Sequence, residues 1–421
     1  MSKRIFLLIL SLILFLSPVL SFADNSDKQK VSLNFLIDEA LKNNPQIQAA
    51  KFRYEAAKSR VKLLRTLEDP KLEFEYDTIT ADMDAVMRGK TSPMRTFSIS
   101  QEFPFPTKLF LRRAAAQKES ASYEQEYKET VHKVIKDVKE GFFQLFLNNK
   151  KTQITNENLD LLNQFIDIAN KKYSLSKVGQ QDSLRAQVEY SKLSNQLVLL
   201  QQEEMISRAI LISLLNRSSD TEIGILEEGS NKTLALDEEA TIKLAKDSRS
   251  ELQSFKEMVR KSEIDLSLAK QEYLPNFMIK YKHEERNGSA GSWAGMLGVT
   301  IPFWFWEKQD SFVKEAKANV EVVKADYRAT ENLVLFEVRS SYAKFEAAKK
   351  LVSIYETGVL PQAQAALETA RIGYQAGKIN FLDLLDSQRA LKEFQIEYFE
   401  SLANLEIDLA NLERSVGTEL K

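Results

Sequence analysis

The segment Tyr173-Ser-Leu-Ser-Lys-Val-Gly-Gln-Gln-Asp-Ser-Leu184 returns 201 residues later as Tyr374-Gln-Ala-Gly-Lys-Ile-Asn-Phe-Leu-Asp-Leu-Leu385. Both copies place a tyrosine, a lysine, an aspartate and a leucine at the same spacing. Two further pairs of segments repeat in the same order, with shifts of 198 and 205 residues: Ser98–Phe105 with Met296–Phe303, and Ala40–Tyr76 with Ala245–Tyr281. Three collinear matches indicate two copies of one supersecondary unit of about 200 residues.

The beginning of the chain has the layout of a secretory signal peptide. Lys3 and Arg4 precede the apolar run Ile5–Leu16, and Ser21-Phe22-Ala23 supplies a cleavage pattern of small residues. The alternative is a membrane anchor, because Ile5–Phe22 is just long enough to span a bilayer. We therefore expect an exported protein made of four parts: a signal peptide (1–23), a first repeat (24–216), a linker or equatorial segment (217–237) and a second repeat (238–421).

Composition predicts a mainly helical chain. Only 13 Gly and 9 Pro occur in 421 residues, and 28% of the residues are charged. Apolar residues recur at helical spacing over very long stretches, and on the last helix they alternate by three and four residues, which is typical of a coiled coil. The expected helices are Leu33–Leu67, Thr107–Leu175 and Gln181–Leu215 in the first copy, and Glu238–Tyr273, Glu307–Ala376 (kinked at Pro361) and Phe381–Val416 in the second.

Between the first and the long helix of each copy, the apolar period changes from 3.6 to 2, which predicts one β-hairpin per copy. One face of the hairpins is apolar and the other is charged. This pattern fits either an ordinary sheet with one wet side or a membrane barrel with a polar lumen. Export, strand length and the aromatic residues at the strand ends favour the barrel. The expected lumen residues are Glu73, Glu75, Asp77, Lys280 and Lys282. The expected membrane-interface aromatics are Phe103, Phe105, Phe303, Trp304 and Trp306, with core packing as the alternative for Trp304 and Trp306.

Four strands are too few to close a barrel, but three chains together would supply twelve. Closure also removes the free strand edges that lipid does not tolerate. The sequence therefore predicts a homotrimer in contact with membrane lipid.

Several kinds of chemistry are missing from the sequence. Cysteine is absent, there are two histidines, and the net charge is -2. We therefore expect no metal site, no nucleic-acid partner and no cofactor. The sequence also contains no phosphate-binding loop or nucleophile motif, so we do not expect an enzyme.

The order of elements resembles the TolC family of outer-membrane efflux channels over the whole mature chain. The most specific stretch is Gly373–Asp386, which is similar to the family's second periplasmic turn, and Val416-Gly417-Thr418 resembles the end of its helical domain. The resemblance implies a trimeric 12-stranded barrel in a Gram-negative-type outer membrane, continued by an α-helical tunnel across the periplasm. It also implies passive export of substrates delivered by an inner-membrane pump and a periplasmic adaptor.

The resemblance further assigns residues to the periplasmic aperture. Asp383 and Asp386 match acidic positions at the narrow end of the tunnel, where a trimer would form rings of carboxylates that bind cations; the alternative is a solvated pair near a helix start. Tyr374 matches a tyrosine of the closed-state latch, whereas Ile379 stands where the latch has an arginine. The turns expected to dock the adaptor contain Lys177, Val178, Gly179, Gly377, Lys378 and Ile379.

A second function remains open at this stage: a periplasmic coiled-coil adaptor or scaffold with ordinary sheets. The sequence does not specify the transported substrate, and it does not distinguish a proton-driven from an ATP-driven pump.

Overall fold

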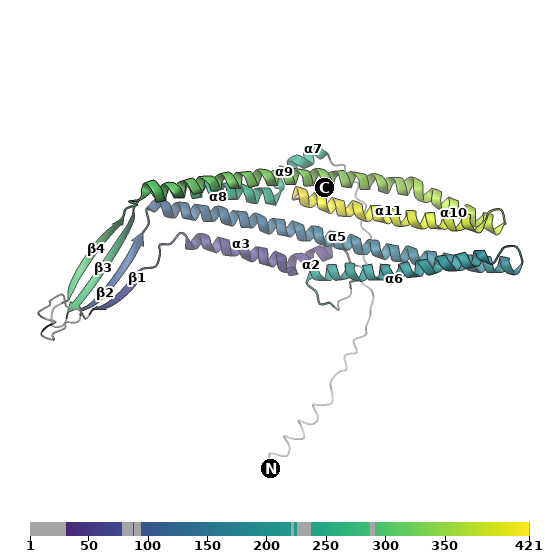
Figure 1. Cartoon of the computed structure of the whole chain (residues 1–421), viewed down its shortest axis with the longest axis horizontal. Helices are drawn as coiled ribbons and strands as arrows, with labels where there is room; N and C mark the ends of the chain where they lie inside the picture. The colour runs from purple at the N-terminus through teal and green to yellow at the C-terminus, as the bar shows by residue number, and fades with distance from the viewer. Residues whose placement is uncertain are drawn as a thin grey trace, which may run out of the picture.

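The computed structural model describes residues 31–77, 87, 94–219, 223–224, 237–286 and 291–420. The expected signal peptide and most of segment 217–237 lie outside these residues. The described chain is elongated, with a small sheet at one end and two helical turns at the other (Figure 1). Within its described part, no helix has an apolar stretch long enough to cross a bilayer.

The first helix of each repeat is broken once, although the sequence predicts one continuous helix in each copy. Copy one has α2 (Leu33–Asn43) and α3 (Pro45–Leu63), and copy two has α7 (Glu238–Ser248) and α8 (Ser250–Gln271). The break residues Asn44 and Arg249 both have extended backbone.

The residues at the two breaks make equivalent hydrogen bonds in the two repeats. The Asn44 side-chain Nδ2 donates to the Leu214 carbonyl at 2.8 Å. The Arg249 guanidinium donates to the Arg414 carbonyl. Leu214 and Arg414 both lie in the last turn of the returning helix of their repeat, so each break docks onto the end of that helix.

The long helices confirm the sequence prediction. The first copy has α5 (Pro106–Ser174) and α6 (Gln181–Leu215). The second copy has the π-helical turn η1 (Phe305–Gln309), then α9 (Asp310–Ile354), the π-helical turn η2 (Tyr355–Val359), α10 (Leu360–Gln375) and α11 (Phe381–Val416). Pro361 lacks an N–H and would break a regular helix. The π-helical turn η2 ends two residues before Pro361, which therefore lies in the first turn of α10, where the missing N–H is tolerated.

The helices form one curved layer (Figure 1). Near the sheet, α8 packs between α5 and α9, and α3 packs on α5. Near the turns, α6 and α11 both pack on α5. The two repeats have equivalent core contacts. Val134 and Val138 of α5 pack with Ala40, and Val334 and Val338 of α9 pack with Ala245.

The four strands form one antiparallel sheet in the order β1 (Lys71–Asp77), β2 (Met94–Phe103), β3 (Asn276–Arg286) and β4 (Ser292–Thr300). The copy-one hairpin thus pairs with the copy-two hairpin through β2 and β3. Strands β1 and β4 have no strand partner on their outer sides in the described chain.

The sheet is inverted relative to that of a soluble protein. On β2, Phe97 and Ile99 are 50% and 42% exposed, whereas Ser98 is 8% exposed. Within the described part of the chain, no helix covers the apolar face, because the sheet extends away from the helical layer (Figure 1). An ordinary half-wet sheet would pack its apolar face against a core, so this arrangement supports the membrane alternative.

Candidate functional site: the two helical turns

The turns that join α5 to α6 and α10 to α11 share one geometry. In copy one, Ser176 has φ 54°, its N–H donates to the Tyr173 carbonyl at 2.8 Å, and the Lys177 N–H donates to Lys172 at 3.0 Å. In copy two, Gly377 has φ 71°. Its N–H donates to the Tyr374 carbonyl at 3.1 Å, and the Lys378 N–H donates to the Gly373 carbonyl at 2.9 Å. Both are Schellman motifs, whose left-handed position favours glycine.

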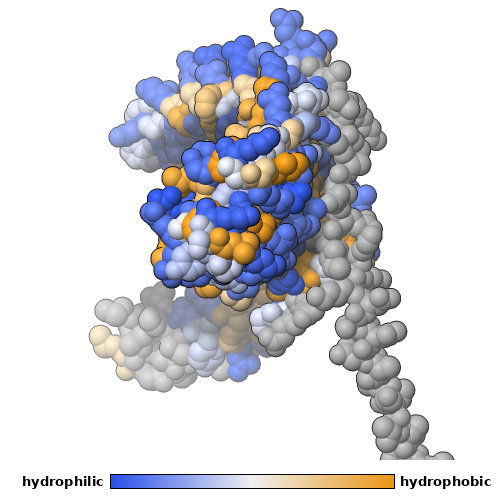
Figure 2. Space-filling model, turned by 90° about the vertical axis from the view of Figure 1, so that its right-hand side faces the viewer, coloured by the Kyte–Doolittle hydropathy of each residue, from blue (hydrophilic) through white to orange (hydrophobic). Residues whose placement is uncertain are grey.

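The side chains proposed to dock an adaptor sit on these two turns. Lys177, Gly179, Gly377 and Lys378 are exposed, whereas Val178 and Ile379 are half-buried. Ile379 packs over Gly373. Figure 2 views the molecule from this end and shows a surface of mainly hydrophilic residues with several hydrophobic patches.

Tyr374 connects the two repeats at this end. Its ring is buried, its hydroxyl donates to Asp182 Oδ2 at 3.2 Å, and its ring centroid lies 5.2 Å from that of Phe381. The Lys172 ammonium donates to the Tyr374 carbonyl and lies 4.2 Å from the ring centroid. Burial and the neighbouring Asp182 carboxylate raise the pKa of Tyr374, so the phenol remains a donor at neutral pH.

The two acidic residues of the predicted gate are exposed on α11. Asn380 caps the helix by accepting from the Asp383 N–H at 2.9 Å. Asp386 lies 3.4 Å from the Arg389 guanidinium, so its charge is partly balanced within one chain. Arg389 also donates to Glu189 of α6 at 2.5 Å. This bond lowers the pKa of the Glu189 carboxyl, although burial opposes the shift.

Sequence reasoning missed several partners at this end. Lys172, Glu189 and Arg389 carried no pattern of their own. Asp182 could have been found, because the repeat alignment places it at the position equivalent to Asp383. The structure thus places Tyr374, Asp383 and Asp386 together at one end, but it ties Tyr374 to the other repeat through Asp182.

At the opposite end, the predicted lumen residues share the polar face of the sheet. Lys280 donates to Glu73 at 2.7 Å, and Ser98 donates to the same carboxylate at 3.2 Å. Lys282 forms an ion pair with Glu284. The small side chains of β2 therefore lie beneath a charge pair that bridges β1 and β3.

The predicted interface aromatics follow the strands. Phe303, Trp304 and Trp306 are 67%, 62% and 54% exposed and touch one another edge to face, with centroids 5.4–5.9 Å apart. Phe103 and Phe105 are half-buried. The exposure of Trp304 and Trp306 speaks against the alternative that they are core residues.

Comparison with known families agrees with this architecture. A profile of the family described as "outer membrane efflux protein" matches residues 36–217 and 241–418, one match in each repeat. The chain belongs to the outer membrane efflux protein family. As a family member, it belongs to a transport family rather than to an enzyme family.

Individual relatives of this efflux protein are distant in sequence. The cobalt-zinc-cadmium resistance protein CzcC of Cupriavidus metallidurans is 21% identical over 442 residues, which cover 99% of this chain and 100% of CzcC. Outer membrane protein TolC of Escherichia coli is 25% identical over 122 residues, 29% of this chain and 24% of TolC. The outer-membrane channel OprN superposes with a TM-score of 0.82 at 17% identity, covering 91% of this chain and 89% of OprN.

The efflux protein is the outer-membrane channel of a tripartite efflux system, and its helical part lies in the periplasm. The prediction of a channel and of TolC-family membership is confirmed, and the alternative of an adaptor or scaffold is wrong. Channels of the TolC type are trimeric and work with an adaptor and an inner-membrane pump.

Proposed function

We propose that three copies of this chain close a 12-stranded barrel in outer-membrane lipid and a continuous helical tunnel below it. The main support for this proposal is the sheet, which exposes its apolar face. Its apolar face is exposed, its polar face holds the Glu73–Lys280 pair, and β1 and β4 are free edges in the described chain. In lipid, unpaired strand edges are costly, so three sheets joined edge to edge satisfy the backbone.

The native mass of the detergent-extracted outer-membrane protein tests closure. Three chains per particle are expected, and the particle should require detergent. A monomer, or a species released without detergent, would contradict the proposal.

We further propose that Asp383 and Asp386 form the cation-binding constriction at the periplasmic end. Three copies would bring six exposed carboxylates to one aperture, of which Arg389 balances only part. In planar bilayers, trivalent cations added on the periplasmic side should block the wild-type channel. The Asp383→Asn/Asp386→Asn variant should resist this block at least tenfold better.

A matched control is available on α5. Glu157 and Asp160 are also exposed and three residues apart, so Glu157→Gln/Asp160→Asn should leave the block unchanged. Equal sensitivity of the aperture variant and the wild type would remove these two aspartates from the constriction.

The two Schellman turns are the proposed contact with the periplasmic adaptor. They are the part of the described chain that lies farthest from the sheet (Figure 1), and both present an exposed lysine, Lys177 and Lys378. Lys177→Glu/Lys378→Glu should weaken co-purification of the cognate adaptor while the native mass stays trimeric. Undiminished adaptor binding would place the contact elsewhere.

The match to CzcC along its whole length favours divalent metal cations as the exported substrate class. Deletion of the protein from its host should increase sensitivity to Zn²⁺, Co²⁺ or Cd²⁺, and the wild-type chain should restore growth. Restored resistance to organic toxicants alone would point to a different cargo.

A further inference from the structure

The apolar face of the sheet carries rows of side chains that run across all four strands. Residues that pair directly across antiparallel strands have their side chains on the same face of the sheet. One such row consists of Phe74, Phe97, His283 and Trp293. The next row, farther from the hairpin turns, consists of Leu72, Ile99, Tyr281 and Gly295. The first row is therefore aromatic on every strand, and the second is mainly apolar.

The rings on this face gather into two clusters, one on each hairpin. On the copy-one hairpin, the ring centroids of Phe74 and Phe97 lie 4.8 Å apart. On the copy-two hairpin, the Trp293 ring stacks on His283 with centroids 3.9 Å apart and on Tyr281 with centroids 5.2 Å apart. Phe74, Phe97 and Trp293 are exposed. Each hairpin thus presents an aromatic cluster to its surroundings.

A groove of about 520 Å³ on the sheet is lined by both aromatic clusters. Leu72 and Ile99 of the second row also line it, together with Glu73 and Ser98. Within the described chain, no helix lies over this part of the sheet (Figure 1). The volume is that of a small-molecule site, and the mainly aromatic and aliphatic lining suits a hydrocarbon chain.

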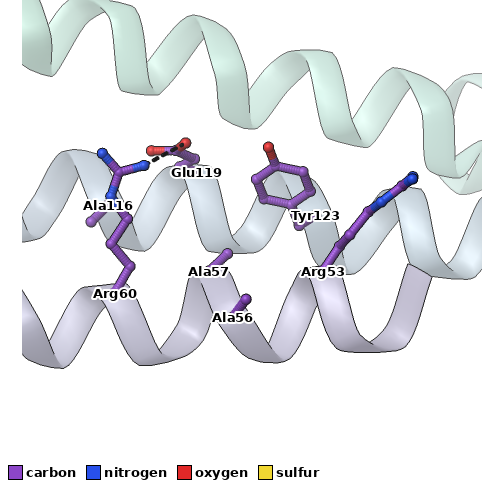
Figure 3. Close-up of a pocket in the computed structure, with 7 residues that line it drawn as sticks. All are labelled: Arg53, Ala56, Ala57, Arg60, Ala116, Glu119 and Tyr123. Atoms are coloured by element: carbon purple, nitrogen blue, oxygen red, sulfur yellow. Dashed lines mark ion pairs between the residues drawn. The ribbon is translucent and has the colours of Figure 1, made fainter. Parts of the chain in front are cut away.

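The groove between α3 and α5 has a different chemistry (Figure 3). Its lining includes Arg53 and Arg60 of α3 and Glu119 of α5. Arg60 forms an ion pair with Glu119 at 3.6 Å. Charged side chains of this kind favour polar ligands, so the groove on the sheet is the better surface for a hydrocarbon.

A cationic side chain lies next to the aromatic row. Arg95 of β2 is two residues from Phe97, so it lies on the same face, about 7 Å nearer the hairpin turns. Its cross-strand neighbours are Tyr76 of β1 and Glu285 of β3. Arg95 is exposed, and no ion pair joins it to another residue in the described ranges. A guanidinium beside an apolar groove is suited to an amphiphile with a phosphate head, because arginine binds phosphate with two parallel hydrogen bonds.

We propose that this face binds lipid A, the phosphorylated lipid of lipopolysaccharide, with one acyl chain in the groove and a phosphate at Arg95. The inference rests on the proposed barrel and names one lipid that the barrel holds. In that barrel the hairpin turns lie at the outer surface, because the strands join the periplasmic helices at their other ends (Figure 1). The outer leaflet of such a membrane consists of lipopolysaccharide, so lipid A rather than a phospholipid meets the aromatic row.

The order of the rows agrees with the depth profile of a bilayer. The row nearest the hairpin turns is polar and contains Tyr76, Arg95 and Glu285. The aromatic row follows at the depth where rings favour the boundary between head groups and hydrocarbon. Leu72 and Ile99 come next and would lie in the hydrocarbon. A lipid with its phosphate at the polar row therefore has its acyl chain at the level of the groove.

Native mass spectrometry of the detergent-extracted protein with added bisphosphorylated lipid A tests the phosphate contact. Arg95→Gln should weaken lipid A binding at least fivefold, because the charged bonds to phosphate are lost. Glu285→Gln removes a carboxylate that repels the phosphate and should strengthen binding. Lys71→Gln is the matched control, since Lys71 is a basic residue at the other end of the sheet, paired with Glu102 at 3.1 Å, and this variant should bind lipid A as the wild type does.

A change within the groove tests the acyl chain separately. Ile99→Trp fills the groove with an apolar ring and should weaken lipid A binding at least fivefold, while the face remains apolar. Leu297→Trp places the same ring on the same face, at an exposed position outside the groove lining. It should bind lipid A as the wild type does. Equal binding by the wild type, Arg95→Gln and Ile99→Trp would overturn the site.

Changing the lipid distinguishes lipid A from other sources of phosphate and acyl chains. Lipid A without its phosphates should bind the wild type as weakly as intact lipid A binds Arg95→Gln. Phosphatidylglycerol should bind at least fivefold more weakly than lipid A, and equal binding of the two would overturn the assignment to lipid A.

The mass of the protein particle separates this site from the trimer. Particles of three chains that bind lipid A equally in all variants would leave the trimer standing and remove the lipid site. Particles with a different number of chains would overturn the trimer on which the inference rests.

Discussion

At the scale of single residues, the two turns differ at one left-handed position. Ser176 has φ 54° where Gly377 has φ 71°, yet both make the same hydrogen bonds. A left-handed conformation costs a non-glycine residue roughly 1–2 kcal/mol, partly offset because glycine loses more entropy on folding. Ser176→Gly should therefore stabilise the chain by up to about 1 kcal/mol. Gly377→Ser should destabilise the chain by a similar amount. A Cβ at position 377 would contact no atom within 4 Å, so the loss would come from the left-handed backbone alone. Thermal unfolding in detergent checks both, and equal melting temperatures would contradict the strain.

Glu189 is expected to make the turn end of the helical layer sensitive to acid. Its carboxylate accepts from Arg389 at 2.5 Å and lies 3.8 Å from Lys192, so its pKa is lower in the folded chain than the usual 4.5. A depressed folded pKa stabilises the fold above the unfolded pKa, and this contribution is lost as the pH falls through the folded pKa. Melting temperatures measured from pH 7 to pH 3 should fall more steeply below about pH 4.5 for the wild type than for Glu189→Gln. Glu203→Gln, an exposed change on the same helix, should follow the wild type.

At the scale of elements, the breaks between paired helices are held by side chains rather than by turn sequences. Arg249 is fully buried, donates to the Arg414 carbonyl, and lies 3.1 Å from Glu251 and 3.4 Å from Glu129 and Glu337. Removal of one partner from a buried charged cluster costs about 3–5 kcal/mol. Arg249→Ala should lower stability by that amount, whereas Arg339→Ala, which removes an exposed pair with Glu238 at 3.8 Å, should change it by less than about 1 kcal/mol. Similar losses in both variants would mean that the cluster does not hold the break.

The helix break at Arg249 is a feature that the local sequence pattern does not predict. The helical period predicts α5, α6 and α11 closely, because each must bury one stripe along its whole length. The helical period continues without interruption through Arg249, however, because the break depends on a contact with Arg414, 165 residues away. At the turn end of the helical layer, the family resemblance assigned Tyr374 and Asp383 to the proposed aperture, but the bond from Arg389 to Glu189 joins two repeats and leaves no local pattern.

At the scale of the whole molecule, one copy of the protein has apolar faces and strand edges that are not covered by its own described residues. Among the described residues, the sheet exposes apolar side chains and leaves the outer edges of β1 and β4 without a strand partner, and the helical layer exposes apolar side chains such as Phe52 of α3 and Phe336 of α9. A single copy of this chain in water would leave all of these surfaces unpaired. Lipid and two further copies would cover them together, so membrane insertion and trimer closure should be coupled.

This coupling predicts that one charge on the outer face of the sheet disrupts assembly, whereas the same charge on the inner face does not. Ile99 of β2 and Met296 of β4 are both apolar and 42% and 54% exposed, but they lie on opposite faces. A lysine on the lipid face costs about 2–4 kcal/mol near the bilayer midplane. Ile99→Lys should therefore reduce the yield of heat-resistant trimer in the outer-membrane fraction severalfold. Met296→Lys, beside Lys280 on the polar face, should assemble nearly as well as the wild type. The opposite ranking would reverse the faces of the sheet and, with them, the proposed lumen.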